Sequence, residues 1–183
     1  KLLGQEPRLL NVLDRVAKES NWETPIGKNR GRGIALQESF GSIVAEVVEV
    51  SVDKGSISVD RVVIAVDPGF AVAPDGLKAQ MESGVIFGLT AALYGEVSIE
   101  NGRVQQSNFD SYPMVRMADS PVIETHIINS YEPWGGAGEP GTPGIAPALA
   151  NAIYAATGTR VRELPVSKYE FNVAFEERNT VPS

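Results

Sequence analysis

A run rich in glycine and proline, residues 134–144, constrains the fold of this chain more than any other stretch. Glycine is conformationally free, and proline fixes φ and lacks an N–H, so this run cannot lie inside a helix or a strand. It is therefore a loop whose backbone another group approaches closely. A single carboxylate, that of Glu139, stands in the middle of the run between small residues.

Residues 145–158 follow this loop directly and predict a buried helix. Thr142 or Gly144 lies near its N-cap, and Gly158 provides the C-terminal stop. Glu139 is thus expected on a loop that feeds a helix N-terminus, where backbone N–H groups and the macrodipole point outward. The functional interpretation is one reactive carboxylate beside an anionic or oxo-rich ligand. The alternative is an exposed glutamate on a tight turn, which composition alone favours.

Composition excludes several classes of site and partner. The 183 residues are 43% hydrophobic and 21% charged, which is typical of a globular domain with a core. The net charge of −7 argues against nucleic acid or an acidic membrane surface as the partner. With no cysteine, the chain carries no thiolate nucleophile and no iron–sulfur cluster, and its one histidine, His126, would have to carry any histidine-based site. No apolar run approaches the about 20 residues of a membrane span.

The hydrophobic pattern predicts an α+β domain with a mixed or antiparallel sheet and two buried helices. An amphipathic helix is expected to start at Pro7 and end near Ser20, and Glu38 and Ser39 are placed in the first turn between strands. His126 is expected on a strand surface or packed, rather than as a ligand. The expected strands are residues 33–36, 42–52 and 56–66, arranged antiparallel, a hairpin formed by 96–100 and 103–107, a strand at 122–128 and a closing strand at 160–165.

The second buried helix is expected over residues 77–94, with Asp75 as its N-cap. Gln80, Gly84 and Gly88 share one face of this helix with Ala91, because they are spaced at helical intervals. Close packing of the helix explains the glycines. It does not explain the Gln80 amide at the mouth of a groove nearly free of side chains, which a ligand could satisfy.

We expect one unit over residues 1–183. It comprises the amphipathic helix (1–21), an α+β core (30–166) and a weakly patterned tail (167–183).

Several ordered motifs then resemble one family. The segments GAGEP (136–140), IAPALANAI (145–153) and AATG (155–158) are similar to the C-terminal signature of molybdenum hydroxylases of the xanthine oxidase family. AQMESG (79–84), ESFG (38–41) and YPMVRM (112–117) narrow the resemblance to the molybdopterin-binding subunit of the isoquinoline 1-oxidoreductase and aldehyde dehydrogenase type. The resemblance runs from about Pro7 to Pro165 and also implies the cofactor-binding fold of that subunit.

The resemblance implies a role for each matched position. Glu139 would be the active-site base that takes a proton from a molybdenum-bound hydroxide, which attacks an electron-poor carbon of the substrate. Gln80 would hydrogen-bond the pterin, and Gly138 would also contact the cofactor. The implied cofactor is molybdopterin in its cytosine dinucleotide form, bound jointly with parts of the subunit outside this chain. The resemblance assigns no metal-ligating side chain to this chain.

The implied protein is larger than this chain. We therefore expect the C-terminal portion of a catalytic subunit that oxidises N-heterocycles or aldehydes with water as the oxygen source. Its expected partners are the rest of the large subunit, a small subunit carrying [2Fe–2S] clusters, and a small-molecule substrate. The isolated chain is expected to be inactive. Two positions depart from the family pattern: Gly144 replaces a second proline, and Trp134, which either shapes the substrate pocket or packs, replaces a smaller residue.

Two other classes of function compete with this interpretation. A non-catalytic binding or assembly domain could share the fold, but a decayed site need not keep both Glu139 and Gln80. A hydrolase that uses one carboxylate would lack a second acid or base near Glu139.

Overall fold

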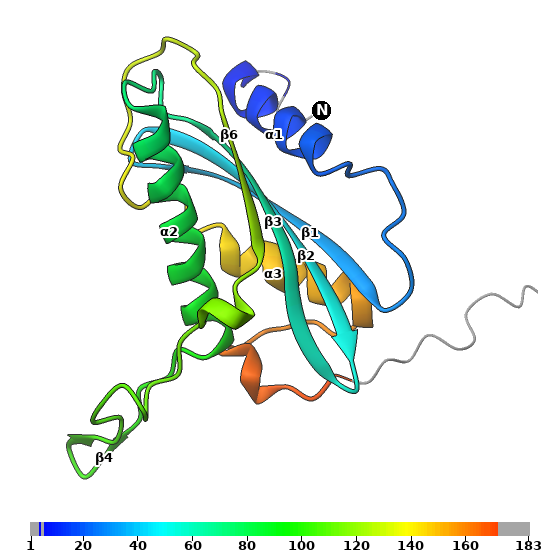
Figure 1. Ribbon diagram of the computed structural model, residues 1–183, viewed down its shortest axis with the longest axis vertical. Helices are drawn as coiled ribbons and strands as arrows, with labels where there is room; N and C mark the ends of the chain where they lie inside the picture. Colours follow the sequence, from blue (N-terminus) through cyan, green and yellow to red (C-terminus); the bar gives the residue numbers. More distant parts are fainter. Residues whose placement is uncertain (1–3, 5, 172–183) are drawn as a thin grey trace, which may run out of the picture.

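The computed structural model describes residues 4 and 6–171, which form a four-stranded sheet in the order β1-β2-β3-β6 (Figure 1). The strands are β1 (Arg30–Ser39), β2 (Ser42–Asp53), β3 (Ser56–Asp67) and β6 (Val122–Ile127). The first three are antiparallel, whereas β6 runs parallel to β3. The predicted α+β fold with a mixed sheet is therefore confirmed.

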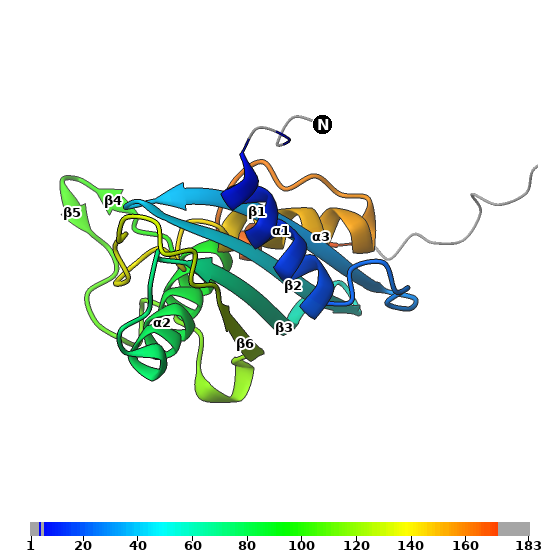
Figure 2. The same cartoon turned by 90° about the horizontal axis from the view of Figure 1, so that it is seen from above.

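Helices cover both faces of this sheet (Figures 1 and 2). Helix α1 (Pro7–Glu19) buries Val12 and Val16 against one face. Helices α2 (Pro74–Leu93) and α3 (Ile145–Thr157) pack on the opposite face and form the larger core there. The sequence predicted α2 and α3 as the two buried helices because their apolar residues occupy most of the circumference.

Two-residue turns set the length of the long strands. Phe40 and Gly41 have φ of 56° and 76°, and Lys54 and Gly55 have φ of 47° and 84°. Positive φ at both central residues is the type I′ geometry that matches the twist of a hairpin. The placement of Glu38 and Ser39 in a turn was wrong, because this turn starts only at Phe40 and leaves both residues in β1.

Two glycines of β1 let α3 lie directly on the sheet. A methyl group at Gly31 would overlap the α3 backbone at Ala152 and Ala156, and one at Gly33 would overlap it at Ala148 and Ala152. Only a residue without Cβ permits this approach. The first residue of α3, and with it the end of the glycine-rich loop, is thereby fixed relative to β1.

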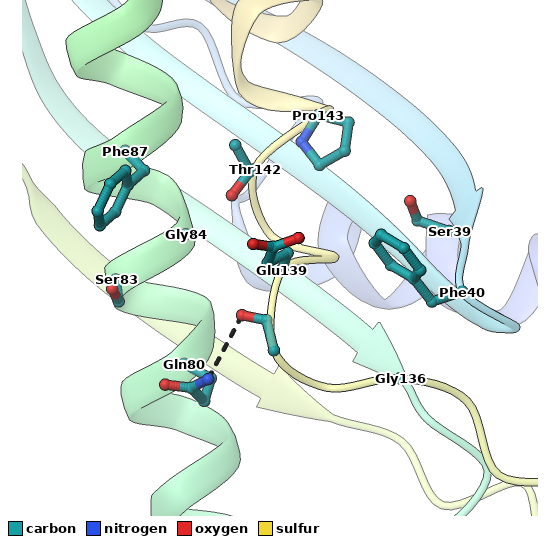
Figure 3. A pocket seen from close by; sticks show the side chains of 11 residues that line it. Ser39, Phe40, Gln80, Ser83, Gly84, Phe87, Gly136, Glu139, Thr142 and Pro143 are labelled. Atoms are coloured by element: carbon teal, nitrogen blue, oxygen red, sulfur yellow. Dashed lines mark hydrogen bonds between the residues drawn. The ribbon is translucent and has the colours of Figure 1, made fainter.

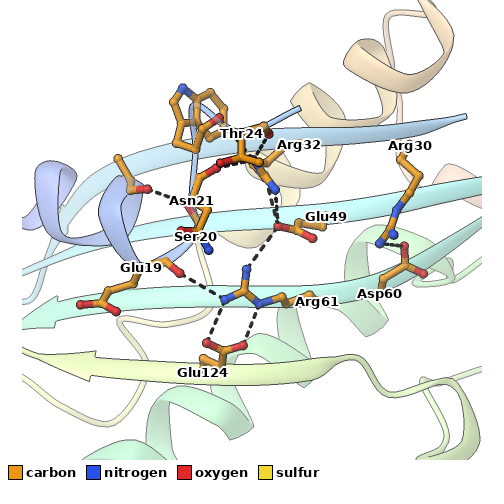
Figure 4. A network of polar contacts seen from close by, with 12 residues as sticks. Glu19, Ser20, Asn21, Thr24, Arg30, Arg32, Glu49, Asp60, Arg61 and Glu124 are labelled. Carbon is orange, nitrogen blue, oxygen red and sulfur yellow. Dashed lines mark hydrogen bonds and ion pairs between the residues drawn. The ribbon is translucent and has the colours of Figure 1, made fainter. Parts of the chain in front are cut away.

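An ionic network ties α1 to the other face of the sheet (Figure 4). Glu49 of β2 accepts hydrogen bonds from Arg32 Nε at 3.0 Å and from Arg61 Nη1 at 3.3 Å. Arg61 also pairs with Glu124 of β6 at 2.7 Å and donates to the carbonyl oxygen of Glu19 at 3.2 Å. The hydrogen bond between Arg61 and Glu124 lowers the pKa of Glu124 and raises that of Arg61. The network therefore joins β1, β2, β3 and β6 to the end of α1.

Three further expectations need correction. Helix α2 begins at Pro74 with Ala73 at its N-cap, so Asp75 lies in the first turn, where its charge favours the helix dipole. The hairpin is shorter than predicted, with β4 (Ile99–Glu100) and β5 (Arg103–Val104) extending away from the body in Figure 1. Within the described residues, the segment 160–165 forms no strand.

Tyr169 explains why residues 160–165 form no strand. The backbone N–H groups of Arg162 and Glu163 donate to the Tyr169 hydroxyl at 2.8 and 2.9 Å, so a side chain takes the place of a neighbouring strand. Short 3₁₀ turns occur at η1 (Met117–Asp119) and η2 (Val166–Lys168). Phe171 is buried, while residues 172–183 of the predicted tail lie outside the described part of the chain.

No helix in the described part of the chain is long and apolar enough to cross a membrane.

Candidate functional site

A groove of about 820 Å³ opens between α2, the β1–β2 turn and the glycine-rich loop (Figure 3). Its lining combines one carboxylate, one amide, small hydroxyl side chains, aromatic rings and several glycines. The lining residues are Ser39, Phe40, Gln80, Ser83, Gly84, Phe87, Gly136, Gly138, Glu139, Thr142 and Pro143. The groove therefore contains all three residues that the sequence assigned to the site.

The glycine face of α2 receives the loop itself. A methyl group at Gly84 would come within 3.0 Å of the backbone of Gly141, and one at Gly88 would come within 2.8 Å of the carbonyl oxygen of Thr142. The loop segment 141–145 thus packs directly against the glycines of α2 and forms the floor of the groove there. The glycines serve close packing, as the structural interpretation held, and the segment packed against them is the loop together with the first residue of α3.

Backbone and side-chain hydrogen bonds hold both ends of this loop. The N–H of Gly136 donates to the carbonyl oxygen of Phe40 at 2.7 Å, and the Ser42 hydroxyl donates to the carbonyl oxygen of Gly136 at 2.7 Å. Further along, Gln37 Nε2 donates to the carbonyl oxygen of Pro140 at 2.8 Å. These contacts fix the loop on each side of its centre, where Glu139 stands.

The three predicted site residues lie on the two walls of the groove. Glu139 is exposed, and its side chain lies between α2 and Phe40 in Figure 3. Gln80 Nε2 lies 3.5 Å from the carbonyl oxygen of Gly138, the long end of the hydrogen-bond range. The Gln80 amide is also exposed and retains the capacity to bind a ligand. The structure thus brings together residues that are 58 positions apart in the chain.

Two aromatic residues complete the groove and were not predicted as site residues. Phe40 and Phe87 are 64% and 70% exposed, which is unusual for large apolar side chains. Phe87 could have been found from the sequence, because it lies seven residues after Gln80 and so on the same helix face. Phe40 could not, because it enters the site only through the positive φ of the turn.

Two other residues singled out from the sequence lie elsewhere. His126 is on the face of β6 that α1 covers, with Nδ1 4.0 Å from Glu19 Oε2, so the expected packed strand histidine is confirmed. Trp134 is 75% exposed and precedes the part of the loop that lines the groove. Among residues 4 and 6–171, no three His, Cys, Asp or Glu side chains are grouped so that they could hold a metal ion.

The arrangement is suited to one kind of chemistry. The Glu139 carboxylate can accept a proton from a group bound in the groove, and the Gln80 amide can donate and accept hydrogen bonds at its edge. Gly136 and Gly138 bring no side chain between the loop backbone and a ligand. A flat cofactor with polar edges, such as a pterin, therefore fits the exposed amide and the bare backbone of this groove.

Comparison with known proteins decides the family. Residues 14–121 match the molybdopterin cofactor-binding domain. The chain belongs to this family. The matched region includes Gln80 and ends before β6, so Gly138 and Glu139 lie outside it. The predicted recognition of a molybdopterin-binding subunit of the xanthine oxidase family is confirmed.

Relatives in this family are much longer than the chain. It is 37% identical over 169 residues to the isoquinoline 1-oxidoreductase subunit beta of Brevundimonas diminuta, covering 90% of this chain and 22% of the relative. It is 34% identical over 171 residues to the membrane-bound aldehyde dehydrogenase [pyrroloquinoline-quinone] of Gluconacetobacter polyoxogenes, covering 90% of this chain and 22% of the relative. The chain thus spans about a fifth of the length of these curated relatives.

Solved structures share the fold. The aldehyde oxidoreductase from Desulfovibrio gigas aligns with a TM-score of 0.61 at 22% identity, over 68% of this chain and 14% of that one. A Cu,Mo-CO dehydrogenase aligns with a TM-score of 0.54 at 23% identity, over 63% and 16% of the two chains. At these identities the likeness supports the fold of the molybdopterin cofactor-binding domain.

Proposed function

We propose that this chain is part of the catalytic subunit of a molybdenum hydroxylase that oxidises aldehydes or N-heterocycles, with water as the oxygen source. One observation carries the proposal: Glu139 and Gln80, which come from separate elements, line the same groove in a chain of the molybdopterin-binding family. The names of its relatives, an isoquinoline oxidoreductase and an aldehyde dehydrogenase, support these two substrate classes.

The groove residues have separate roles in the proposed reaction. Glu139 accepts the proton that is released when the water-derived oxygen attacks the substrate, because its carboxylate lies in the groove without bulk beside it. Gln80 and the backbone at Gly138 bind the edge of the cofactor. The cofactor, when bound, supplies the two-electron oxidation of the substrate. Phe40 and Phe87 provide apolar walls that orient an aromatic or aliphatic substrate.

The proposal extends to partners outside this chain. The cofactor is the cytosine dinucleotide form of molybdopterin and is held jointly with the rest of the large subunit, since the groove is open on one side of this chain. Electrons leave through [2Fe–2S] clusters on a small subunit. The chain contains no cysteine, so it cannot ligate such clusters itself.

The cofactor content of the intact subunit tests this proposal. The subunit is purified with its partners from a host that makes the molybdenum cofactor, and molybdenum and cytosine nucleotide are measured per chain. About one of each is expected, because a single groove binds a single cofactor. A well-folded protein that contains neither would overturn the proposal in favour of a non-catalytic domain. Pyrroloquinoline quinone in place of molybdenum would overturn it in favour of quinone chemistry, which the name of the Gluconacetobacter polyoxogenes relative indicates for that protein.

A further inference from the structure

A second glutamate lies behind the loop that carries Glu139. Glu46 is in the middle of β2, paired with Ala35 of β1 and Ile64 of β3, and its side chain is fully buried. By alternation it faces the same side of the sheet as Val44 and Val48, toward α2 and α3. A glutamate at such a core position is rare, because burying a charged carboxylate is costly.

Among the described residues, the carboxyl group of Glu46 has no hydrogen-bond partner of its own. Neither Oε1 nor Oε2 has a hydrogen-bond partner within the part of the chain that the structure describes. An ionised carboxylate in this setting would lose its hydration without compensation, whereas a neutral carboxylic acid loses far less. In agreement with this argument, burial raises the pKa of Glu46 well above its ordinary value.

Among the residues that the structure describes, none around Glu46 offers a positive charge to hold it ionised. Helix α3 contains no charged residue, and the charged side chains of α2, Asp75, Lys78 and Glu82, are exposed. The only charged residue of the loop 134–144 is the exposed carboxylate Glu139, so the loop supplies no positive charge either. Beside Glu46, β1 contributes the uncharged amide of Gln37, and β3 contributes Ile64.

Glu46 contacts the loop where α3 begins. Gly144 is the N-cap of α3, and a methyl group there would overlap Glu46 Oε2 and lie 3.3 Å from Gln37 Nε2. Gln37 in turn donates the hydrogen bond to Pro140, the residue after Glu139. The amide of Gln37 thus holds the segment 140–144 at Pro140, and the carboxyl of Glu46 packs against it at Gly144. Both side chains come from the sheet.

We propose that Glu46 is a positioning residue for Glu139. As a neutral carboxylic acid it fills the space left by Gly144 and fixes the loop between β2 and the start of α3. The inference rests on the proposed function only for the role of Glu139. The uncharged state of Glu46 and its contact with Gly144 stand on the structure of this chain alone.

Infrared spectroscopy of the intact subunit tests the protonation state. At pH 7 the wild type is expected to show the carbonyl stretch of a buried carboxylic acid, which Glu46→Gln removes. Folding of the wild type requires Glu46 to keep its proton, whereas folding of Glu46→Gln does not. The folding equilibrium constant of Glu46→Gln, divided by that of the wild type, should therefore increase with pH. The increase should start near the ordinary glutamate pKa and reach up to about tenfold per pH unit. Identical spectra and a pH-independent ratio would overturn the proposal.

Turnover and a double-mutant cycle test the positioning. Glu46→Ala is expected to lower kcat by up to about 100-fold, the scale of an ångström-sized misplacement, with KM little changed, and Glu46→Gln should restore kcat. Gly144→Ala should destabilise the wild type but be tolerated in the Glu46→Ala background, since its methyl group then has space. Failure of Gln to restore turnover, or additive effects in the cycle, would overturn the positioning role. The infrared, folding and cycle measurements need no turnover, so they decide on Glu46 even where the metal content overturns the proposed function.

Discussion

Gln37 and Pro140 join the edge strand of the sheet to the proposed catalytic loop. The Gln37 Nε2 atom of β1 donates a 2.8 Å hydrogen bond to the carbonyl oxygen of Pro140, across 103 positions of the chain. Pro140 follows Glu139 directly, so this bond holds the backbone beside the proposed base. A loop so rich in glycine would otherwise have many conformations available to it.

Replacing Gln37 tests the importance of this bond. Gln37→Leu leaves the Pro140 carbonyl without its donor and is expected to lower the free energy of unfolding by about 1 kcal/mol. Turnover of the intact enzyme should fall, because the substitution loosens the loop that carries Glu139. Its molybdenum content should stay the same, because the Gln80 amide proposed to bind the cofactor is unchanged. Gln105→Leu, on the exposed hairpin, is the matched control and should change neither quantity. Equal behaviour of the two variants would contradict the tether.

The packing of α3 on β1 gives a prediction about stability. Gly33→Ala forces a methyl group into the backbone of α3 and should lower the free energy of unfolding by about 3 kcal/mol. Gly76→Ala, in the first turn of α2, meets nothing closer than 3.8 Å and should instead raise it by about 0.5–1 kcal/mol. Urea unfolding of both variants measures the two effects. The same sign for both would contradict the close approach at Gly33.

The ion pair between Arg8 and Asp67 gives a prediction about acid stability. Burial alone would raise the pKa of Asp67, but hydrogen bonds from Arg8, the Gly69 N–H and Ser130 outweigh it and leave the pKa below its ordinary value of 3.8. A lowered pKa stabilises the fold above pH 3.8, and this contribution is lost as the pH falls through the folded-state value. The link between α1 and the end of β3 therefore weakens in acid.

Arg8→Met should remove this contribution. The wild type is expected to exceed the variant in free energy of unfolding by about 2 kcal/mol at pH 7, and the difference should shrink as the pH falls below 3.8. Arg15→Met, which removes an exposed pair with Glu19, is the control and should cost less than about 0.5 kcal/mol. A difference between wild type and Arg8→Met that does not depend on pH would contradict the role of Asp67.

Gln80 is expected to act in binding rather than in proton transfer. Gln80→Ala in the intact enzyme should lower the molybdenum content per chain, because one hydrogen-bonding group at the cofactor edge is lost. Turnover per bound molybdenum should change much less. Ser83→Ala, one turn along the same helix and also in the groove, is a matched control. A loss of turnover per molybdenum with full metal content would assign Gln80 to the chemistry instead.

Much of the fold could be predicted because its signals are local. The apolar alternation of β2 and β3, the largely apolar and uncharged α3 and the Gly158 stop, with φ of 74°, each follow from neighbouring residues. The absence of a strand at 160–165 could not be foreseen, because the Tyr169 hydroxyl satisfies that backbone from several positions away. The same limit explains why β6 could be predicted as a strand but not its parallel pairing with β3.

The candidate site, like the fold, could be predicted only in part from the sequence. Glu139 and Gln80 could be selected from motif and spacing, whereas their meeting in one groove depends on the tertiary packing of the loop on α2. Glu46 was overlooked although a signal exists, since it occupies the inward phase of an alternating strand between Val44 and Val48. Its contact with Gly144 could not be read from the sequence, because 98 positions separate the two residues.

The most direct test of the proposed function compares Glu139→Gln with the wild type in the intact enzyme, using Glu132→Gln as the control. Glu132 is an exposed glutamate shortly before the groove-lining part of the loop. With molybdenum content equal in all three proteins, Glu139→Gln is expected to lower kcat by about 10²–10⁴-fold, the usual contribution of a positioned base. Glu132→Gln should retain wild-type turnover. A Glu139→Gln enzyme that contains full molybdenum and turns over at the wild-type rate would contradict the assignment of Glu139 as the base.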